Sequence, residues 1–491
     1  MNQGQTPYAD ALNAFSGRDL VRVIVPGHGA EGGGVPERLE HFIASKPFHK
    51  DFTPLLTGLD KGDGNPLDQA KELAAQAWKA RRVWFLTNGA SQGNRITAIA
   101  LRGLGEHLLA QRSTHSSFVD GLVLSGLTPE FVLPNLDLKR GIAHGVSAAA
   151  VEERLAELTE PPVAVYIISP SYFGAVADVE GIATVVHSYG LPLIVDAAWG
   201  AHFGFSSSVP ENPINLGADL VISSTHKLGG SLTQSAMLHL AEGPFADELE
   251  PLIDRAFGLT QSTSENTWLL ASLDIARHFL VTGEERIAAS VQSADSLRQL
   301  VRENPYLDLV EDSFAEFLDI LTHDPLHVAI DVSATGVSGH ELKEYVANEH
   351  GVYFEASTHN SVVALLGAGA MPDASRIMES IDQARKVLGH SSLATTDLTE
   401  LGIPIPAAGQ RRMSPREAFL RDHDLVPASE AAGRISADTL AAYPPGIPNL
   451  LPGEEITQET VDFLSAVAAS PGGFIRGAVD RSSSHYRVVK G

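Results

Sequence analysis

The sequence predicts an α/β fold in which helices flank a mainly parallel sheet. Between about residues 66 and 285, short apolar runs alternate with amphipathic stretches, an order typical of βαβ units. The apolar runs are continuous rather than alternating with polar residues, as expected when helices cover both faces of a sheet. The 491 residues are enough for roughly two to four domains, so this region is one part of a larger architecture.

Individual strands and helices are expected in chain order within this region. The segment VWFL (83–86) predicts a first strand, and residues 91–110 predict the helix that follows it. Later apolar runs predict three more strands, at 163–168, 192–195 and 220–222. Amphipathic stretches predict helices over 178–189 and 265–283, the second of which leads out of the region.

Pattern and composition divide the chain into four parts. These are an N-terminal arm, a large domain, a smaller α+β domain and a C-terminal domain, expected at residues 1–60, 61–285, 286–395 and 396–491. Apolar runs at 327–332 and 361–366 predict strands of the α+β domain. Residues 400–452 are rich in proline and predict a stiff, extended connector.

Composition excludes several functions. The formal net charge of −25 disfavours nucleic acid and anionic membrane as partners and mildly favours cationic small molecules, although solubility alone would also explain it. The chain has no cysteine, which excludes disulfides, thiolate metal sites and cysteine nucleophiles. The scattered His28, His202 and His226 predict no metal site. The first residues do not form a signal peptide and no apolar run approaches ~20 residues, so we expect a cytoplasmic enzyme.

The sharpest chemical motif is SSTHKLGG (223–230), in which Lys227 follows a predicted strand end. Hydroxyl residues and His226 precede the lysine and could bind a phosphate, and two glycines follow it. A lysine that forms a Schiff base needs a lowered amine pKa in such close quarters. The alternative for an isolated motif of this kind is a surface lysine in a polar loop.

Three further segments carry polar residues at strand ends or in loops. Asp196 ends the apolar run LIVD, where it could pair with a protonated pyridine nitrogen or act only as a helix cap. The segment TNGASQG (87–93) lies between a strand and a helix, where backbone N–H groups could cradle a phosphate, unless the helix is simply capped. His115 could stack on a flat ring or be a structural loop residue.

A phosphate loop, a histidine, a strand-end aspartate and then a lysine follow one another in the chain order of fold-type I pyridoxal phosphate (PLP) enzymes. From about residue 22 to 455, the sequence resembles the ornithine/lysine/arginine decarboxylases of that fold. The segments that carry the resemblance are PGHG (26–29), LTNGASQGN (86–94), RSTHSS (112–117), SPSYFG (169–174), VDAAWGAHF (195–203), SSTHKLGG (223–230), QSTSENTWLLASLD (261–274) and YPPGIPNLLPGE (443–454).

The resemblance implies an aspartate-aminotransferase-like fold with a mainly parallel seven-stranded sheet, and a short chain without the receiver-like domain that precedes longer members. It implies that Lys227 holds PLP as a Schiff base and that Asp196 binds the pyridine nitrogen. His115 would stack on one ring face and Ala198 would lie against the other. The residues implied for the phosphate are Gly89, Ala90, Ser91, Ser224 and His226. Those implied for the phosphate of a neighbouring subunit, and hence for a homodimer or larger homo-oligomer, are Ser262, Thr263 and Ser264.

The activity implied by the resemblance is decarboxylation of a basic amino acid such as arginine, lysine or ornithine, which gives an amine and carbon dioxide. A basic substrate needs an acidic contact for its distal cation. Glu355 in VYFEAS is the candidate, and a surface charge is the alternative for it. His202 is a second candidate for a substrate contact.

The sequence also departs from the family on the substrate side. Gly29 stands where the family has a lysine after PGH, the segment LDKGDGNPLD (59–68) lacks the family's histidine, and Ser116 replaces a lysine after His115. Two alternatives therefore stay open: another fold-type I enzyme, such as an aminotransferase or a lyase, or a PLP-binding protein without catalysis.

Overall fold

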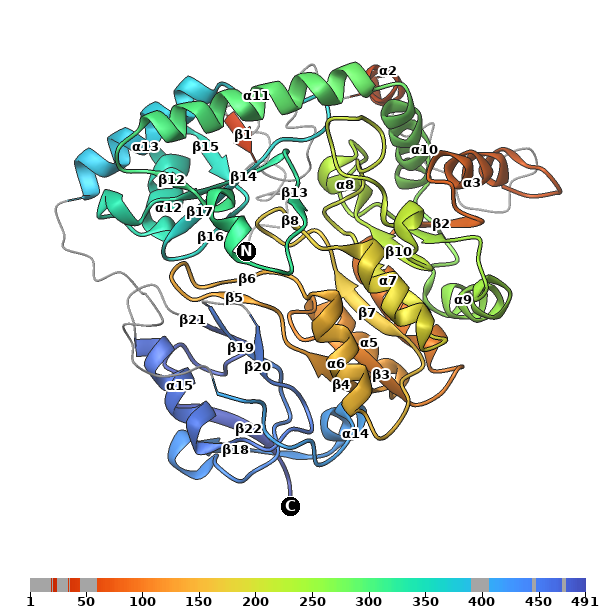
Figure 1. Cartoon of the computed structure of the whole chain (residues 1–491), viewed down its shortest axis with the longest axis vertical. Coiled ribbons are helices and arrows are strands. Elements are labelled where there is room, and N and C mark those ends of the chain that lie inside the picture. The colour runs from red at the N-terminus through yellow and green to blue at the C-terminus, as the bar shows by residue number, and fades with distance from the viewer. Residues whose placement is uncertain are drawn as a thin grey trace, which may run out of the picture.

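The computed structural model describes residues 19, 21–23, 34, 36–44, 60–389, 406–443, 447–469 and 474–491. The PGHG segment, most of the predicted N-terminal arm and the expected boundary at residues 395 and 396 lie outside these ranges. Within them, three groups of elements form a large, a small and a C-terminal domain (Figure 1).

The large domain is built on a seven-stranded sheet in the order β2-β11-β10-β9-β7-β3-β4. The strands are β2 (Arg82–Leu86), β11 (Ala236–Leu240), β10 (Leu220–Ser223), β9 (Leu193–Asp196), β7 (Val165–Ile168), β3 (His107–Gln111) and β4 (Thr128–Val132). Only β11 runs antiparallel to its two neighbours in this sheet. The predicted α/β class with a mainly parallel sheet is thereby confirmed.

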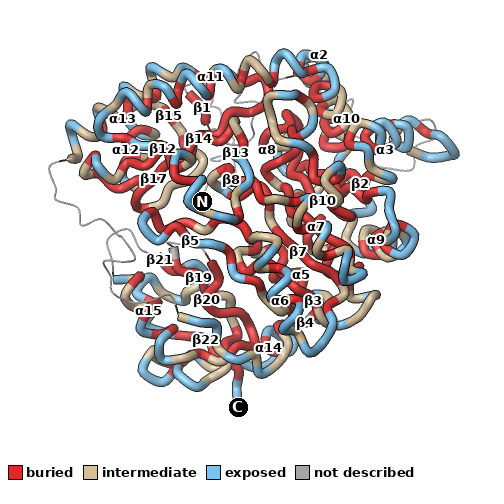
Figure 2. Tube along the Cα trace, in the orientation of Figure 1, coloured by how far each residue is buried: buried red, intermediate tan, exposed pale blue. Residues whose placement is uncertain are grey.

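Helices cover both faces of this sheet. The core on one face joins the sheet to α4 (Gly89–Leu101), α5 (Ser116–Ser125) and α9 (Ala246–Thr260). The core on the other face joins it to α6 (Ala148–Glu157) and α7 (Val179–Ser188). Side chains of one strand alternate between the two cores, so the central strands are apolar throughout. Figure 2 shows these strands in the red that marks buried residues.

The helix expected over 91–110 is a wrong prediction. Helix α4 ends at Leu101, and His107–Gln111 is the buried strand β3. Gly103 and Gly105 lie between them, and a Cβ on Gly103 would lie only 2.7 Å from Leu252 Cδ2. These glycines allow the chain to leave the helix and turn back into the sheet, a change that the apolar periodicity alone did not reveal.

The small domain holds a four-stranded sheet in the order β12-β14-β17-β16. Its strands are β12 (Asp308–Leu309), β14 (His327–Asp331), β17 (Ser361–Leu365) and β16 (Ala356–Ser357), and its helices are α11 (Glu284–Glu303), α12 (Gly339–His350) and α13 (Ala374–Leu388). Strand β1 (Val21–Val23) pairs with β15 (Val352–Phe354), so this N-terminal segment packs into the core of the small domain. Helix α10 (Thr267–Val281) precedes α11 and matches the helix expected there.

Shorter elements connect these domains. A hairpin of β5 (Leu136–Asp137) and β6 (Ile142–Ala143) extends from the large domain, and β8 (Ala175–Val176) pairs with β13 (Thr322–His323). The remaining helices and 3₁₀ turns are α2 (Glu37–Ala44), α3 (Pro66–Ala77), η2 (Pro213–Leu216), α8 (Thr225–Leu228), η3 (Val310–Glu316), η4 (Ser333–Thr335) and η5 (Ala428–Glu430). None of the helices in the described ranges is both long and apolar enough to cross a membrane.

The C-terminal domain lies below the β5–β6 hairpin in Figure 1. It contains α14 (Pro415–Leu420), β18 (His423–Pro427), β19 (Leu440–Tyr443), β20 (Pro448–Leu450), α15 (Gln458–Ala469), β21 (Phe474–Arg476) and β22 (His485–Val489). The prediction of an extended connector over 400–452 is therefore wrong for the described part, which forms strands and a helix around a buried core. The prolines instead begin α14 and β20, positions where a missing N–H costs little.

Candidate active site

A cavity of about 380 Å³ opens where β9 and β10 end, a volume typical of small-ligand sites. The register of the sheet aligns Ile168 of β7 and Ile222 of β10 with Asp196 of β9, so these strand ends share one edge. The large domain supplies most of the lining, and Arg476 brings the C-terminal domain to it. In open parallel sheets, ligands bind at this carboxyl edge.

Asp196 ends β9 in a buried setting, with 3% of its surface exposed. Its Oδ2 accepts hydrogen bonds from Asn94 Nδ2 (3.0 Å) and from the Tyr166 hydroxyl (2.8 Å), and its Oδ1 accepts one from the Ala198 N–H (3.1 Å). These donors fix the direction of the carboxylate at the cavity wall. The arrangement suits an anion that pairs with a protonated ring nitrogen.

Lys227 lies in the short helix α8 and lines the cavity. Its Nζ is 3.4 Å from the ring centroid of Trp199 and 6.0 Å from that of Tyr172. Burial lowers the pKa of the Lys227 amine to about 8, and the carboxylates of Asp196 and Glu355 oppose that shift. A lysine with such a pKa keeps a fraction of neutral, nucleophilic amine near neutral pH.

The start of helix α4 forms an edge of the same cavity, through Gly89, Ala90 and Ser91. Gly89 has a positive φ of 72° and donates its N–H to the Gln234 carbonyl (2.7 Å). The N-cap residue Asn88 makes no capping hydrogen bond with its side chain. The following N–H groups of the first turn have no acceptor within the helix, so they can bind a phosphate.

His226 lines the cavity beside Ser224, and its ring is held by the backbone. Its Nδ1 donates to the Ser235 carbonyl (2.8 Å), and burial lowers its pKa to about 4. In the neutral ring, Nε2 is then an acceptor. A hydrogen bond from His226 to a phosphate therefore requires a second proton, which a nearby dianion would favour.

His115 caps the N-terminus of helix α5 and lines the cavity, as Ala198 does. Its Nδ1 accepts from the Ser117 N–H (3.2 Å) and lies 2.7 Å from the Ser117 hydroxyl. Burial is the main cause of its lowered pKa, which Asp196 raises and Lys227 lowers further. A neutral imidazole fixed in this way can lie flat against a bound ring.

The remaining candidates lie outside the cavity lining. Glu355 directly precedes the lining residues Ala356 and Ser357, and its charge reaches Lys227. Residues 262–264 are exposed between α9 and α10. His202 is fully buried, and its Nε2 lies 3.0 Å from Asp324 Oδ1. The placement of His202 argues against the substrate contact expected for it, because no surface of its side chain is free to meet a ligand.

Sequence reasoning missed several residues of this site. Asn94 and Tyr166 hold Asp196, Trp199 and Tyr172 surround Lys227, and Arg476 reaches the cavity from the C-terminal domain. Asn94 lies in the segment LTNGASQGN and is, with Gln92, one of two buried amides of α4, so a polar residue within that segment is a detectable signal. The position of Arg476 depends on the packing of two domains and left no local pattern.

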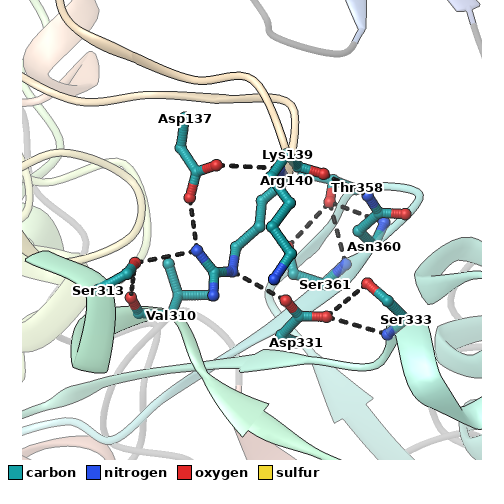
Figure 3. Close-up of polar contacts among 10 residues, drawn as sticks. All are labelled: Asp137, Lys139, Arg140, Val310, Ser313, Asp331, Ser333, Thr358, Asn360 and Ser361. Atoms are coloured by element: carbon teal, nitrogen blue, oxygen red, sulfur yellow. Dashed lines mark hydrogen bonds and ion pairs between the residues drawn. The ribbon is translucent and has the colours of Figure 1, made fainter. Parts of the chain in front are cut away.

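A buried ion network joins the β5–β6 hairpin to the small domain (Figure 3). Arg140 in the hairpin donates through Nη1 to Asp137 Oδ2 (2.7 Å) and through Nε to Asp331 Oδ2 (2.8 Å) at the end of β14. The same Nη1 donates to the Ser313 hydroxyl (2.9 Å), and Asn360 Nδ2 donates to the Lys139 carbonyl (2.9 Å). The network thus holds the hairpin, which lines the cavity through Gly141 and Ala143, against the turn that contains Asn360 and begins at the lining residue Thr358.

We expect Arg140→Leu to lower the free energy of unfolding by about 3–5 kcal/mol, because it leaves Asp137 and Asp331 buried without their cation. Urea unfolding monitored by circular dichroism measures the change. Arg154→Leu is the control, since Arg154 forms more exposed ion pairs with Glu130 and Glu157 and its loss should cost no more than about 1 kcal/mol. Equal losses for the two variants would contradict the interpretation of Arg140 as a buried link.

The donors and acceptors of the cavity fit PLP. Free N–H groups at the start of α4 match its phosphate, the carboxylate of Asp196 matches its pyridine nitrogen, and the amine of Lys227 matches its aldehyde. The part of the chain that the structure describes contains no cluster of histidine and carboxylate side chains suited to a metal ion.

Comparisons with known proteins agree with this chemistry. The family model described as "Orn/Lys/Arg decarboxylase, major domain" matches residues 6–373, and the model of that family's C-terminal domain matches residues 406–474. A curated arginine decarboxylase of Bacillus subtilis is 31% identical over 100% of this chain and 99% of its own length. The lysine decarboxylase LdcA of Pseudomonas aeruginosa is 22% identical over 93% of this chain and 75% of its own length.

Solved structures show the same fold. Lysine decarboxylase A from Pseudomonas aeruginosa superimposes with a TM-score of 0.74 and 19% identity, over 99% of this chain and 82% of that chain. A serine palmitoyltransferase from Sphingomonas wittichii superimposes with a TM-score of 0.56 and 16% identity, over 78% of this chain and 96% of that one. Both likenesses support the fold-type I architecture.

Proposed function

Because this chain belongs to the Orn/Lys/Arg decarboxylase family, we propose that it removes the α-carboxylate of arginine as carbon dioxide and releases the corresponding amine. The chain is a PLP-dependent decarboxylase of a basic amino acid, and arginine is the specific substrate proposed. The observation that carries the proposal is the convergence of Lys227, Asp196 and the start of α4 on one cavity in a chain whose full-length relatives include arginine decarboxylases.

The residues proposed to hold PLP are those already described at the cavity. The first turn of α4 would bind the phosphate together with Ser224, Asp196 would keep the ring nitrogen protonated, and His115 and Ala198 would lie against the ring faces. PLP supplies an electron sink for the electron pair left on Cα when the carboxylate departs.

The chain itself must then orient the substrate and move protons. The bond to the carboxylate has to stand perpendicular to the ring, so the walls that fix the α-carboxylate decide between decarboxylation and proton abstraction. The apolar part of the lining, which includes Ile168, Phe173 and Trp199, would offer water few partners, and a water-poor site favours loss of a charged group as neutral carbon dioxide. The Nζ of Lys227 would carry the proton that is returned to Cα.

Glu355 is proposed to bind the distal cation of the substrate. Its backbone is fixed by two hydrogen bonds: its N–H donates to the Val363 carbonyl (2.9 Å) and its carbonyl accepts from Lys343 Nζ (2.8 Å). Its carboxylate acts on the charge of Lys227, and the next two residues, Ala356 and Ser357, line the cavity. A carboxylate in this place complements a guanidinium group.

We expect Glu355→Gln to raise the KM for arginine roughly 10- to 100-fold, because a charge-assisted hydrogen bond is lost, while kcat changes little. The preference for arginine over its neutral isostere citrulline should fall by a similar factor. Steady-state kinetics with both amino acids measure the effect. Glu344→Gln, an exposed change on α12, is the control and should leave both constants unchanged. An unaltered preference in Glu355→Gln would remove Glu355 from the substrate site.

We also propose that the enzyme is a homodimer, in which residues 262–264 of one subunit reach the phosphate site of the other. The exposed position of this segment, between α9 and α10, leaves its hydroxyls available to a partner. Light scattering should give twice the monomer mass, which is 52.2 kDa. Mixing inactive Lys227→Ala subunits with subunits that carry Ser262→Ala and Ser264→Ala should regenerate some fully native sites and recover activity. A monomer, or a mixture without recovery, would contradict the proposal.

The deciding experiment for the reaction is a screen for carbon dioxide release from every common amino acid, with PLP added. Release from arginine, with the matching amine as product, is expected. Release from lysine or ornithine instead would keep the decarboxylase and overturn arginine as substrate. Amino transfer to a keto acid without carbon dioxide would overturn the reaction itself.

A further inference from the structure

The amine of Lys227 rests on the face of an indole ring. Its Nζ lies 3.4 Å from the ring centroid of Trp199, which is close even for a cation–π contact. Trp199 is 5% exposed and lines the cavity, so most of its surface packs against the protein and a small part faces the cavity. This contact lies on the wall that continues from Asp196 through Ala198.

The indole is clamped between two other rings. Tyr172 meets it edge-on at 5.2 Å and 61°, and His327 meets it edge-on at 5.6 Å and 78°. Gly174 packs behind His327 so closely that a Cβ on this glycine would lie 2.7 Å from His327 Cβ. The backbone of Gly174 therefore packs directly against the start of the His327 side chain.

A buried cluster fixes His327 in turn. Asp324 Oδ2 lies 2.8 Å from His327 Nδ1, and Asp324 Oδ1 lies 3.0 Å from His202 Nε2 and accepts the Leu326 N–H (3.0 Å). The side chains of His202, Asp324 and His327 are all inaccessible to solvent. Three titratable groups buried together are costly unless they bond one another, and here they form a rigid support for the indole.

Two carboxylates and two histidines interact electrostatically with Lys227. Asp196 and Glu355 act on its charge, and its own charge acts on His115 and His226. The carboxylates would favour an ammonium at Nζ, and burial opposes it. An aromatic face attracts the ammonium more strongly than the neutral amine, and it cannot accept the proton of the ammonium.

We propose that Trp199 is a positioning residue for Lys227: its ring holds the Nζ ammonium at the cavity wall whenever that amine is free, and the His202–Asp324–His327 cluster keeps the ring in place. The inference rests on the proposed role of Lys227. It adds a specific assignment, since an aromatic ring, beside the carboxylates of Asp196 and Glu355, helps to keep on Nζ the proton needed at Cα.

The test measures the acidity of Lys227 in the full-length chain after PLP has been removed by dialysis. Wild type, Trp199→Leu, Trp199→Phe and the control Trp78→Leu are acetylated across a range of pH, and peptide mapping follows Lys227. Trp78 packs against Phe205 in a separate core and does not line the cavity. Return of the PLP absorbance on adding the cofactor back shows that each variant is folded.

The expected result is a shift of the Lys227 midpoint to lower pH by roughly 0.5–1.5 units in Trp199→Leu, because the lost attraction favoured the charged form. Trp199→Phe should shift by less, and Trp78→Leu should not shift. A wild-type midpoint in Trp199→Leu overturns the proposal. This readout needs no turnover, so it stands apart from failure of the proposed substrate.

Kinetics give a second, independent readout. Loss of a positioned proton donor should lower kcat of Trp199→Leu roughly 10-fold or more with KM nearly unchanged, and Trp199→Phe should recover part of it. A raised KM with wild-type kcat would mean that the ring binds substrate instead, and would overturn the assignment. If wild type fails to release carbon dioxide from any amino acid, the proposed function fails, while the acetylation result still decides the contact between Trp199 and Lys227.

Discussion

Replacement of Lys227 by alanine is expected to lower kcat for decarboxylation by at least roughly 10³-fold, the largest loss of any single substitution in this chain. Lys227 is the lysine at the carboxyl edge of the sheet whose amine has a pKa lowered to about 8 by burial, and it lies with Asp196 on one cavity. Among the described residues that line the cavity, no other supplies a primary amine. Carbon dioxide release under saturating arginine measures the effect.

The same substitution has a chemical signature that does not depend on turnover. Borohydride reduction of wild type with PLP should fix the cofactor on the peptide that contains Lys227, and Lys227→Ala should retain none. Lys139→Ala is a suitable control, because Lys139 is an exposed lysine at the tip of the nearby hairpin. Label on another peptide, or near-normal turnover of Lys227→Ala, would refute the assignment of this lysine.

The residues of this site that could be predicted from sequence are those identified by the short segment around each of them. An apolar run that ends in Asp196 places a carboxylate at the edge of a parallel sheet, because the chain direction and the strand end together fix where it lies. The start of α4 and the lysine after β10 follow from the same rule. Each is a short-range feature, and the sheet brings all of them together.

The parts that could not be predicted depend on contacts between distant segments. Asp324 and His202 are 122 residues apart, and nothing near either one indicates that they meet in the core. Arg140 and Asp331 are 191 residues apart and join two domains. The error at residues 91–110 is of another kind: apolar periodicity continued across Gly103 and Gly105, whereas α4 ends at Leu101 and the chain turns back into β3 at His107.

The second large effect is expected from Asp196→Asn. The amide keeps the shape of the side chain, and Asn94 and Tyr166 can still donate to its oxygen, so the cofactor should still bind. With the amide oxygen turned toward these donors, the NH₂ group takes the place of Oδ1 and loses the hydrogen bond from the Ala198 N–H. A neutral partner no longer favours a proton on the ring nitrogen, which weakens the electron sink and should lower kcat roughly 10²- to 10³-fold with a small change in KM.

A matched control separates this loss from a loss of stability. Asp219 is also buried and precedes β10, where it accepts the Leu193 N–H (2.7 Å) and bonds His187 (2.9 Å), but it does not line the cavity. Asp219→Asn should therefore reduce the free energy of unfolding by about 1–3 kcal/mol and leave kcat unchanged. The contrary result is that Asp196→Asn, like Asp219→Asn, lowers only the free energy of unfolding and leaves kcat unchanged. That result would make the Asp196 carboxylate a structural group and would contradict its role in the electron sink. A fall in kcat confined to Asp196→Asn, with PLP absorbance retained, is the result expected when a buried charge acts on the cofactor rather than on the fold.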